Sequence, residues 1–399
     1  MTRFKLNLSS LAWFTFVFFI ITKAFAGPIG MYFPYLRFIP ILLMIILMTL
    51  KSYKLIISKA SCLVIFSIIL LYIFIGVLYS SLGQALFGLY MFVPLIFSFI
   101  HYEEILPRII TRKNHLNFFL FVTCIIGVLY VNSFGAAWIG MEQEIGGVTK
   151  QISKAWSSDG IIRNPGFTSG SVTAASIILI TASMLSINLV KSGKYIINLC
   201  ILSLSVYSIF LTTTKTMIFS ICIVMILIVI PSFFCRLVVK LTLVFSVLFS
   251  YFFMFGDKFN GYYVSDNTFL IRMFGTWPNA ISMLDEKMSL LFGKGFGAIG
   301  TPTYLFNANQ VSPADNFYVY LYVIFGLISS IFIALLFLKM VTQKNYLTDS
   351  NKNFYILLFI IFLGALTYNL VESTIYAVYG GVLIGAIWFG KGKYIALKV

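Results

Sequence analysis

The stretch from residue 171 to residue 211 reads SVTAASIILITASMLSINLV, then KSGK, then YIINLCILSLSVYSIFL. Each apolar run is close to the roughly 20 residues that an α-helix needs to cross a hydrocarbon core about 30 Å thick. The short connection carries Lys191 and Lys194, and basic residues concentrate in the short cytoplasmic loops of membrane proteins. The stretch therefore predicts two membrane-spanning helices joined on the cytoplasmic side.

Runs of the same kind recur along the chain, which has 399 residues, 60% of them hydrophobic and only 10% charged. Soluble domains are about 45–50% apolar, so water is not the main solvent here. We predict an all-α integral membrane protein with about 12 transmembrane helices in a single domain, residues 1–399. The runs lie at approximately 9–25, 31–50, 60–79, 84–100, 116–133, 171–190, 195–211, 216–231, 238–255, 316–338, 354–371 and 374–390.

The distribution of charge predicts the orientation of these helices. With the N-terminus inside, most of the 28 basic residues fall in internal segments and most of the acidic residues fall outside, as the positive-inside rule requires. Both termini are then cytoplasmic, and two long loops, about 134–170 and about 256–315, are external. Ala24-Phe25-Ala26 resembles a signal-peptidase site, but Lys23 interrupts the approach and the next span follows at once. We expect this segment to be retained.

The net charge of +16 does not point to nucleic acid, because the basic residues are scattered over loops at the level of anionic lipid head groups. The membrane surface is the better partner. The five cysteines (Cys62, Cys124, Cys200, Cys222 and Cys235) lie in or beside predicted spans. No disulfide framework, metal cluster or cofactor is expected from them.

The second long loop contains a predicted helix. From Pro278 to Leu291 the apolar residues recur on one helical face and the polar residues on another. Pro278 suits a first helical turn and Gly293 suits a stop. The pattern predicts an amphipathic helix on the outer membrane surface.

Three basic residues depart from the charge rule: Arg163, Lys215 and Arg272 are predicted outside or at the outer ends of spans. Arg163 stands just before the sixth span, whose N-terminal N–H groups would attract phosphate. Lys215 begins the eighth span, where a cation opposes the helix dipole and calls for an anionic neighbour. Anchoring to lipid phosphates is the alternative for both residues. Arg37, near the outer end of the second span, is a weaker case of the same kind.

The segment Gly293-Lys294-Gly295-Phe296-Gly297-Ala298-Ile299-Gly300 contains a formal GxGxxG. A dinucleotide fold is not expected, because the motif follows a helix rather than a strand. Two interpretations remain: a nest of backbone N–H groups that binds an oxyanion, or a turn that ends a helix.

Two acidic residues stand near the predicted outer edge of the membrane. Asp315 could act as a base toward a sugar hydroxyl, or it could belong to a capping box with Ser312 and Pro313. Glu372 could equally serve as a cap or polar contact. The two histidines, His101 and His115, fall in a predicted cytoplasmic loop. No external Ser/His or Cys/His arrangement is therefore expected.

Three local patterns together resemble one family. They are Arg163-Asn164-Pro165-Gly166-Phe167 before a span, Leu211-Thr212-Thr213-Thr214-Lys215-Thr216, and a long pattern that runs from Arg272 and Trp277 through Leu291-Phe292-Gly293-Lys294-Gly295 to Ala314-Asp315-Asn316-Phe317-Tyr318 and Gly326-Leu327. In this order and spacing they resemble the O-antigen polymerases (Wzy), within the wider group that includes O-antigen ligases. Many relatives have Arg where this chain has Lys215. Ligases of the group typically have an external His beside the Asn of the last pattern, which favours a polymerase.

The resemblance implies a metal-independent, cofactor-independent glycosyl transfer at the periplasmic face of the bacterial inner membrane. Donor and acceptor would both be undecaprenyl diphosphate-linked oligosaccharides, and the sequence leaves open whether a chain-length regulator binds. The residues expected to be catalytic are Asp315, Arg272 and Arg163, and those expected to bind substrate are Lys215, Trp277, Lys294, Gly295, Asn316, Arg37 and Glu372.

Two other functions stay open: an O-antigen ligase, and a lipid-linked oligosaccharide flippase or other transporter. A transporter should place ionisable groups or broken helices near the bilayer midplane. Here the exceptional charges cluster at the outer ends of the predicted spans, a distribution that favours a membrane enzyme.

Overall fold

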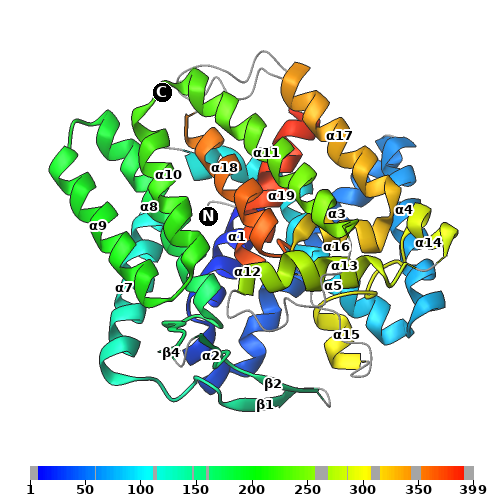
Figure 1. The fold of residues 1–399 in the computed structure, drawn as a ribbon, viewed down its shortest axis with the longest axis horizontal. Helices are drawn as coiled ribbons and strands as arrows, with labels where there is room; N and C mark the ends of the chain where they lie inside the picture. Colours follow the sequence, from blue (N-terminus) through cyan, green and yellow to red (C-terminus); the bar gives the residue numbers. More distant parts are fainter. Residues whose placement is uncertain are drawn as a thin grey trace, which may run out of the picture.

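In a computed structural model of the chain, the described residues are 8–58, 60–110, 115–145, 148–158, 161–256, 268–284, 286–306, 315–342 and 352–390. They form a predominantly helical structure (Figure 1). The longer helices are α1 (Leu8–Ala24), α3 (Ile39–Ser58), α4 (Ala60–Tyr79), α5 (Leu82–Ile100), α7 (His115–Phe134), α8 (Ser171–Lys191), α9 (Tyr195–Leu211), α10 (Lys215–Val229), α11 (Ser232–Met254), α17 (Leu327–Thr342), α18 (Lys352–Thr367) and α19 (Thr374–Phe389). The shorter ones are α2 (Ala26–Tyr32), the 3-10 helix η1 (Pro34–Phe38), α6 (Tyr102–Ile110), α12 (Thr268–Ile271), the π-helical turn η3 (Arg272–Thr276), α13 (Trp277–Ile281), α14 (Lys287–Phe292), α15 (Thr301–Phe306) and α16 (Phe317–Phe325).

The helices have the length and surface of a membrane protein. Within the described ranges, five are long and apolar enough to cross a bilayer, or six if α1 and α2, which are bent by 83°, form one span. Large apolar side chains stand on the outside of the bundle, for example Ile196, which is 82% exposed, and Phe252, which is 75% exposed. Such surfaces favour contact with lipid over contact with water. The architecture is compatible with an all-α membrane protein, while the count of 12 spans stays a prediction.

The core of the bundle is formed by helices that are apolar on all sides. Almost every residue of α18 and α19 is buried, and the two helices lie at the centre of the view in Figure 1. There α19 packs against α5, and α18 packs against α11. A helix that is hydrophobic all round belongs in such an interior position.

One end of the bundle carries residues 135–145, 148–158 and 161–170 together with the helices α12 to α15, and we call it the loop end. Here β1 (Glu142–Ile145) pairs antiparallel with β2 (Val148–Gln151), and β3 (Ser157–Ser158) pairs with β4 (Ile161–Ile162). The first of these hairpins and α15 lie at the lower edge of Figure 1. The sequence predicts a long loop at 134–170 but not these hairpins.

Two predicted helices are broken in the structure. The tenth predicted span, 316–338, is divided into α16 and α17 at Gly326, whose φ of 57° favours glycine. A Cβ there would collide with the carbonyl oxygen of Leu291. The prediction of one amphipathic helix from Pro278 to Leu291 is wrong, because α13 ends at Ile281 and the chain turns before α14. On its predicted apolar face (Ile281, Leu284, Met288 and Leu291), Leu284 is buried and Ile281 half-buried, whereas Met288 and Leu291 are 63% and 46% exposed.

The glycine-rich segment after α14 packs between α4, α5 and α16. A Cβ on Gly295, whose φ is 75°, would collide with the backbone of Gly76 in α4. The backbone N–H groups of Lys294, Gly295 and Phe296 donate to the carbonyl oxygens of Val323, Ile324 and Tyr72, at 2.8, 3.0 and 3.1 Å. These donors are engaged within the protein, which supports the helix-ending turn over the oxyanion nest.

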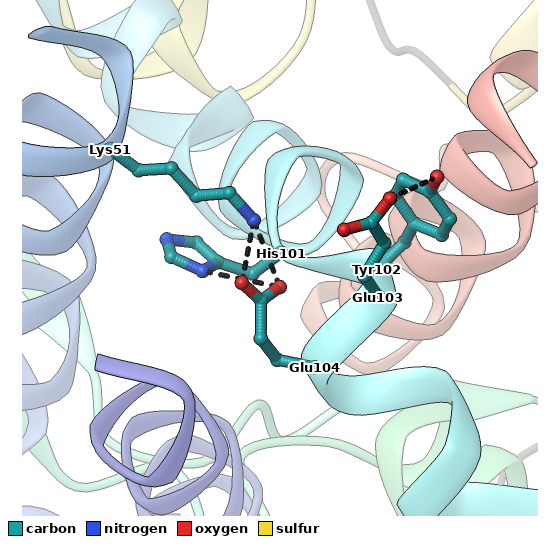
Figure 2. Close-up of polar contacts among 5 residues, drawn as sticks. All are labelled: Lys51, His101, Tyr102, Glu103 and Glu104. Carbon is teal, nitrogen blue, oxygen red and sulfur yellow. Dashed lines mark hydrogen bonds and ion pairs between the residues drawn. The ribbon is translucent and has the colours of Figure 1, made fainter. Parts of the chain in front are cut away.

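A charged cluster joins α3 to α6 (Figure 2). Lys51 of α3 contacts both carboxylate oxygens of Glu104 in α6, at 2.8 and 2.9 Å. His101, which the sequence placed in a loop, is fully buried between α5 and α6, with Nδ1 3.7 Å from the Glu104 carboxylate. Burial acts to raise the pKa of Glu104, but the contacts with His101 and Lys51 outweigh it and hold the pKa at about 2.

This cluster predicts a pH-dependent contribution to stability. The folded-state pKa of Glu104 lies below its ordinary value, so the stabilisation is present above about pH 4.5 and is lost as the pH falls toward 2. The Glu104→Gln variant should lower the free energy of unfolding at pH 7 by roughly 2–3 kcal/mol, and less at pH 4. Thermal unfolding in detergent measures this. Glu103→Gln, on the exposed neighbour that accepts only from Tyr102 in Figure 2, is the matched control; equal losses in both variants would contradict the assignment.

Candidate functional site

The residues that converge at the loop end surround Tyr368, which directly follows α18. Its hydroxyl lies 2.6 Å from Thr216 Oγ1 in the first turn of α10. The phenol also interacts electrostatically with the positive charges of Arg272 and Arg163 and with the negative charge of Asp315. Two arginines predicted from separate loops therefore act on the same phenol group.

Arg272 is held by two contacts. Its Nε lies 3.0 Å from Asp315 Oδ2, and its Nη1 donates to the carbonyl oxygen of Thr367 at 3.2 Å. The side chains of Arg272 and Asp315 are 23% and 40% exposed. An ion pair this accessible contributes little to stability, and it leaves the remaining guanidinium surface available to an anionic ligand.

Arg163 is presented by a turn that is fixed to α7. The Asn164 side chain donates to the carbonyl oxygen of Val128 at 2.8 Å and accepts from the N–H of Gly166 at 2.9 Å. The Arg163 N–H donates to the carbonyl oxygen of Trp156 at 2.8 Å. Its Nε is buried and has no hydrogen-bond partner among the described residues. A buried donor without a partner costs free energy of folding, because its hydrogen bond to water is lost and not replaced. A bound anion would accept that hydrogen bond.

Lys154 and Glu372 extend this group of charges. The N–H of Lys154 donates to the carbonyl oxygen of Ser169 at 3.1 Å, just before α8. Lys154 as a residue keeps exposed surface, but protein surrounds its ammonium group. Burial therefore lowers the pKa of Lys154, against the opposing effect of Glu372 and Asp315.

Glu372 lies in the turn between α18 and α19. Its Oε1 accepts from the N–H of Thr301 at 2.7 Å, which joins this turn to the start of α15. Burial of the carboxylate raises the pKa of Glu372, and Asp315 adds to this, whereas the Thr301 N–H and Lys154 act to lower it. Glu372 is thus both an anchor for α15 and a carboxylate within the charged site.

The arrangement combines three cations, Lys154, Arg163 and Arg272, with the carboxylates of Asp315 and Glu372. Arginines contact phosphate oxygens in bidentate fashion, and fixed cations stabilise charge that develops on a leaving group. A carboxylate nearby can accept a proton from an attacking hydroxyl. Within the described ranges, no three or more His, Cys, Asp or Glu side chains are grouped as metal ligands.

Asn316 is the N-cap of α16, and this corrects the predicted capping box. Its Oδ1 accepts from the N–H groups of Tyr318 and Val319 at 2.9 and 3.2 Å. Helix α16 begins at Phe317, so Asp315 precedes the helix instead of lying in its first turn, while Ser312 and Pro313 lie outside the described residues. An Asn side chain is as good a cap as Ser, and it takes that place here.

The other half of the Asn316 amide fixes α16 to its neighbours. Its Nδ2 donates to Ser250 Oγ at 2.8 Å and to the carbonyl oxygen of Leu366 at 3.1 Å, and the residue is 1% exposed. Because all these contacts are internal, they support a role for Asn316 in positioning Asp315 over direct contact with substrate.

Trp277 and Lys294, which the sequence predicts to bind substrate, each contact aromatic rings of the protein. Trp277 is 1% exposed and packs edge-on against Phe249 and Phe269, which supports a structural role. The Lys294 ammonium lies 5.2 Å from the centre of the Tyr79 ring, at the end of α4.

Lys215 and Arg37 occupy two further positions at the loop end. Lys215 is exposed at the start of α10 and lines a pocket of about 690 Å³ together with Asn164. Arg37 joins η1 to β1, because its Nη2 donates to Gln143 Oε1 at 3.1 Å.

Three residues of this site were not predicted from the sequence: Lys154, Thr216 and Tyr368. Lys154 carried a usable signal, because it is a basic residue in a predicted external loop, as is Arg163. Tyr368 carried none, since a tyrosine at the end of an apolar run is typical of an interfacial anchor.

No protein-family model matches the chain, and comparisons with curated proteins and with solved structures give no match either.

Proposed function

We propose that this chain is a membrane-embedded glycosyltransferase of the inner membrane that polymerises polysaccharide repeat units. Its substrates would be two undecaprenyl diphosphate-linked oligosaccharides, one acting as donor and the other as acceptor, at the periplasmic face. The observation that carries the proposal is the convergence of Arg163 and Arg272 at Tyr368, beside Asp315.

The chemistry assigned to these residues is a single displacement. A hydroxyl of the acceptor sugar attacks the anomeric carbon of the donor sugar, and the bond from that carbon to the diphosphate oxygen breaks. The diphosphate leaves with the bonding electrons, and Arg163 and Arg272 stabilise its charge. The hydroxyl proton passes to Asp315, with Glu372 as the other carboxylate within the site.

Purified protein in vesicles, supplied with lipid diphosphate-linked repeat units, tests the proposal. We expect a ladder of lengthened lipid-linked products. Transfer of a finished polymer to a different lipid acceptor without a ladder would replace the polymerase by a ligase. Movement of the lipid across the bilayer without any new glycosidic bond would replace it by a flippase.

The proposed orientation has its own test. Ser157 is exposed in β3 at the loop end, so a single cysteine there should react with a membrane-impermeant maleimide in intact spheroplasts. A cysteine at Asp285 should behave in the same way, and one at Lys344 should react only after the membrane is opened; both positions lie outside the described residues. Protection at Ser157 and Asp285 with labelling at Lys344 would reverse the orientation.

A further inference from the structure

The pocket of about 690 Å³ at the loop end lies between α7, α9 and α10. These helices form the left side of the molecule in Figure 1. Its volume falls in the range of about 300–1,000 Å³ that is usual for small-molecule sites. Most of the lining is apolar and includes Val131, Ile139 and Ile218. Phe210 also lines it and is 65% exposed, so the pocket is reached from the outer side of the bundle.

The polar part of the lining includes the side chain of Thr213. Thr213 Oγ1 is buried and has no hydrogen-bond partner within the part of the chain that the structure describes. Thr213 also has a φ of 56°, a left-handed conformation that a β-branched residue rarely adopts. Strain of this kind is often found at ligand sites, and Lys215 places a positive charge on the same wall.

The pocket and the charged site are built in part from residues that are neighbours in the chain. Asn164 and Lys215 line the pocket, while their neighbours Arg163 and Thr216 belong to the group around Tyr368. The two sites therefore meet at two segments of the chain, residues 163–164 and 215–216.

We propose that this pocket binds the first part of the hydrocarbon chain of a lipid diphosphate, with Thr213 donating a hydrogen bond to a phosphate oxygen. The inference rests on the proposed function, which supplies a ligand with an anionic head and a long apolar chain. A glycan does not fit this lining, because its hydroxyl groups would lose their hydrogen bonds to water without replacement. A hydrocarbon chain suits the apolar lining because it has no hydrogen bonds to lose, and the cations at one end fix its direction.

Photocrosslinking tests the occupant. Benzoylphenylalanine would replace Phe210, which lines the pocket, or Phe219, which is 61% exposed on α10 and serves as the matched control. The probe is radiolabelled undecaprenyl diphosphate without sugar, in vesicles of phosphatidylethanolamine and phosphatidylglycerol. We expect labelling at Phe210 to exceed that at Phe219 severalfold and to be displaced by unlabelled undecaprenyl diphosphate but not by added phosphatidylglycerol. Equal labelling at both positions, or equal displacement by both lipids, would overturn the proposal.

A second variant tests the hydroxyl without removing bulk. Thr213→Val should raise the concentration of probe that half-saturates labelling at Phe210 by about five- to tenfold. Thr242→Val is the control, because Thr242 Oγ1 donates only within α11, to the carbonyl oxygen of Val238. No change in the Thr213 variant would remove Thr213 from the site.

The probe carries no sugar, so its binding does not depend on polymerisation. Displaceable labelling at Phe210 in a protein that makes no ladder would leave the pocket standing and remove the proposed function. A ladder from a protein without selective labelling at Phe210 would leave the proposed function standing and overturn the assignment of the pocket.

Discussion

Replacement of Arg272 by Ala should abolish polymer formation in protein that remains inserted in the membrane, and Arg163→Ala should do the same. Loss of one fixed group that stabilises a departing anion typically lowers the rate by about 10²–10³. For Arg272 the change also removes the ion partner of Asp315. Lysine at either position should restore only part of the rate, because an ammonium group lacks the planar fork that contacts two phosphate oxygens.

The measurement is the initial rate of ladder formation at matched amounts of folded protein. Arg236→Ala is the control, since Arg236 lies in the first turns of α11, far along that helix from the loop end. Near-normal rates in both the Arg163 and the Arg272 variants would remove the core of the mechanism. A loss of folded protein in proportion to the loss of rate would assign the arginines a structural role instead.

The sequence predicts helices well where an apolar run is long and uninterrupted. The runs at 171–190 and 195–211 correspond to α8 and α9 within one residue, because helix length and apolar content are local properties. The break at Gly326 was not predicted, because it depends on a backbone contact with Leu291, 35 positions earlier in the chain. The predicted amphipathic helix failed because periodicity over 278–291 does not show that α13 ends at Ile281 and that a second helix, α14, begins at Lys287.

The charged site was predictable in part. The departure of Arg163 and Arg272 from the charge rule is visible in the sequence, and both residues act on Tyr368 in the structure. The pairing of Arg272 with Asp315 joins positions 43 residues apart, and it accompanies the packing of α13, which directly follows η3, against α16. Trp277 belongs to the same sequence pattern, yet it is buried, because a local motif does not show which of its members reach the surface.

The Asp315→Asn variant should lower the elongation rate by roughly 10²–10⁴ at saturating substrate if Asp315 accepts the proton of the attacking hydroxyl. Asparagine keeps the size of the side chain but cannot accept a proton as a carboxylate does. Because Asn316 and not Asp315 caps α16, and because the ion pair with Arg272 is exposed, the variant should keep nearly normal thermal stability in detergent.

The Glu372→Gln variant distinguishes the role of Glu372 from that of Asp315. An amide oxygen can still accept from the Thr301 N–H, so the link from the α18–α19 turn to α15 should survive while the ionisable group is removed. If Asp315 is the base, we expect only a severalfold loss of rate in this variant. The opposite ranking, with near-normal turnover in Asp315→Asn and a loss of 10² or more in Glu372→Gln, would transfer the role to Glu372. The raised pKa of Glu372 then predicts a rate that falls as the pH drops through that pKa, because protonation removes the base.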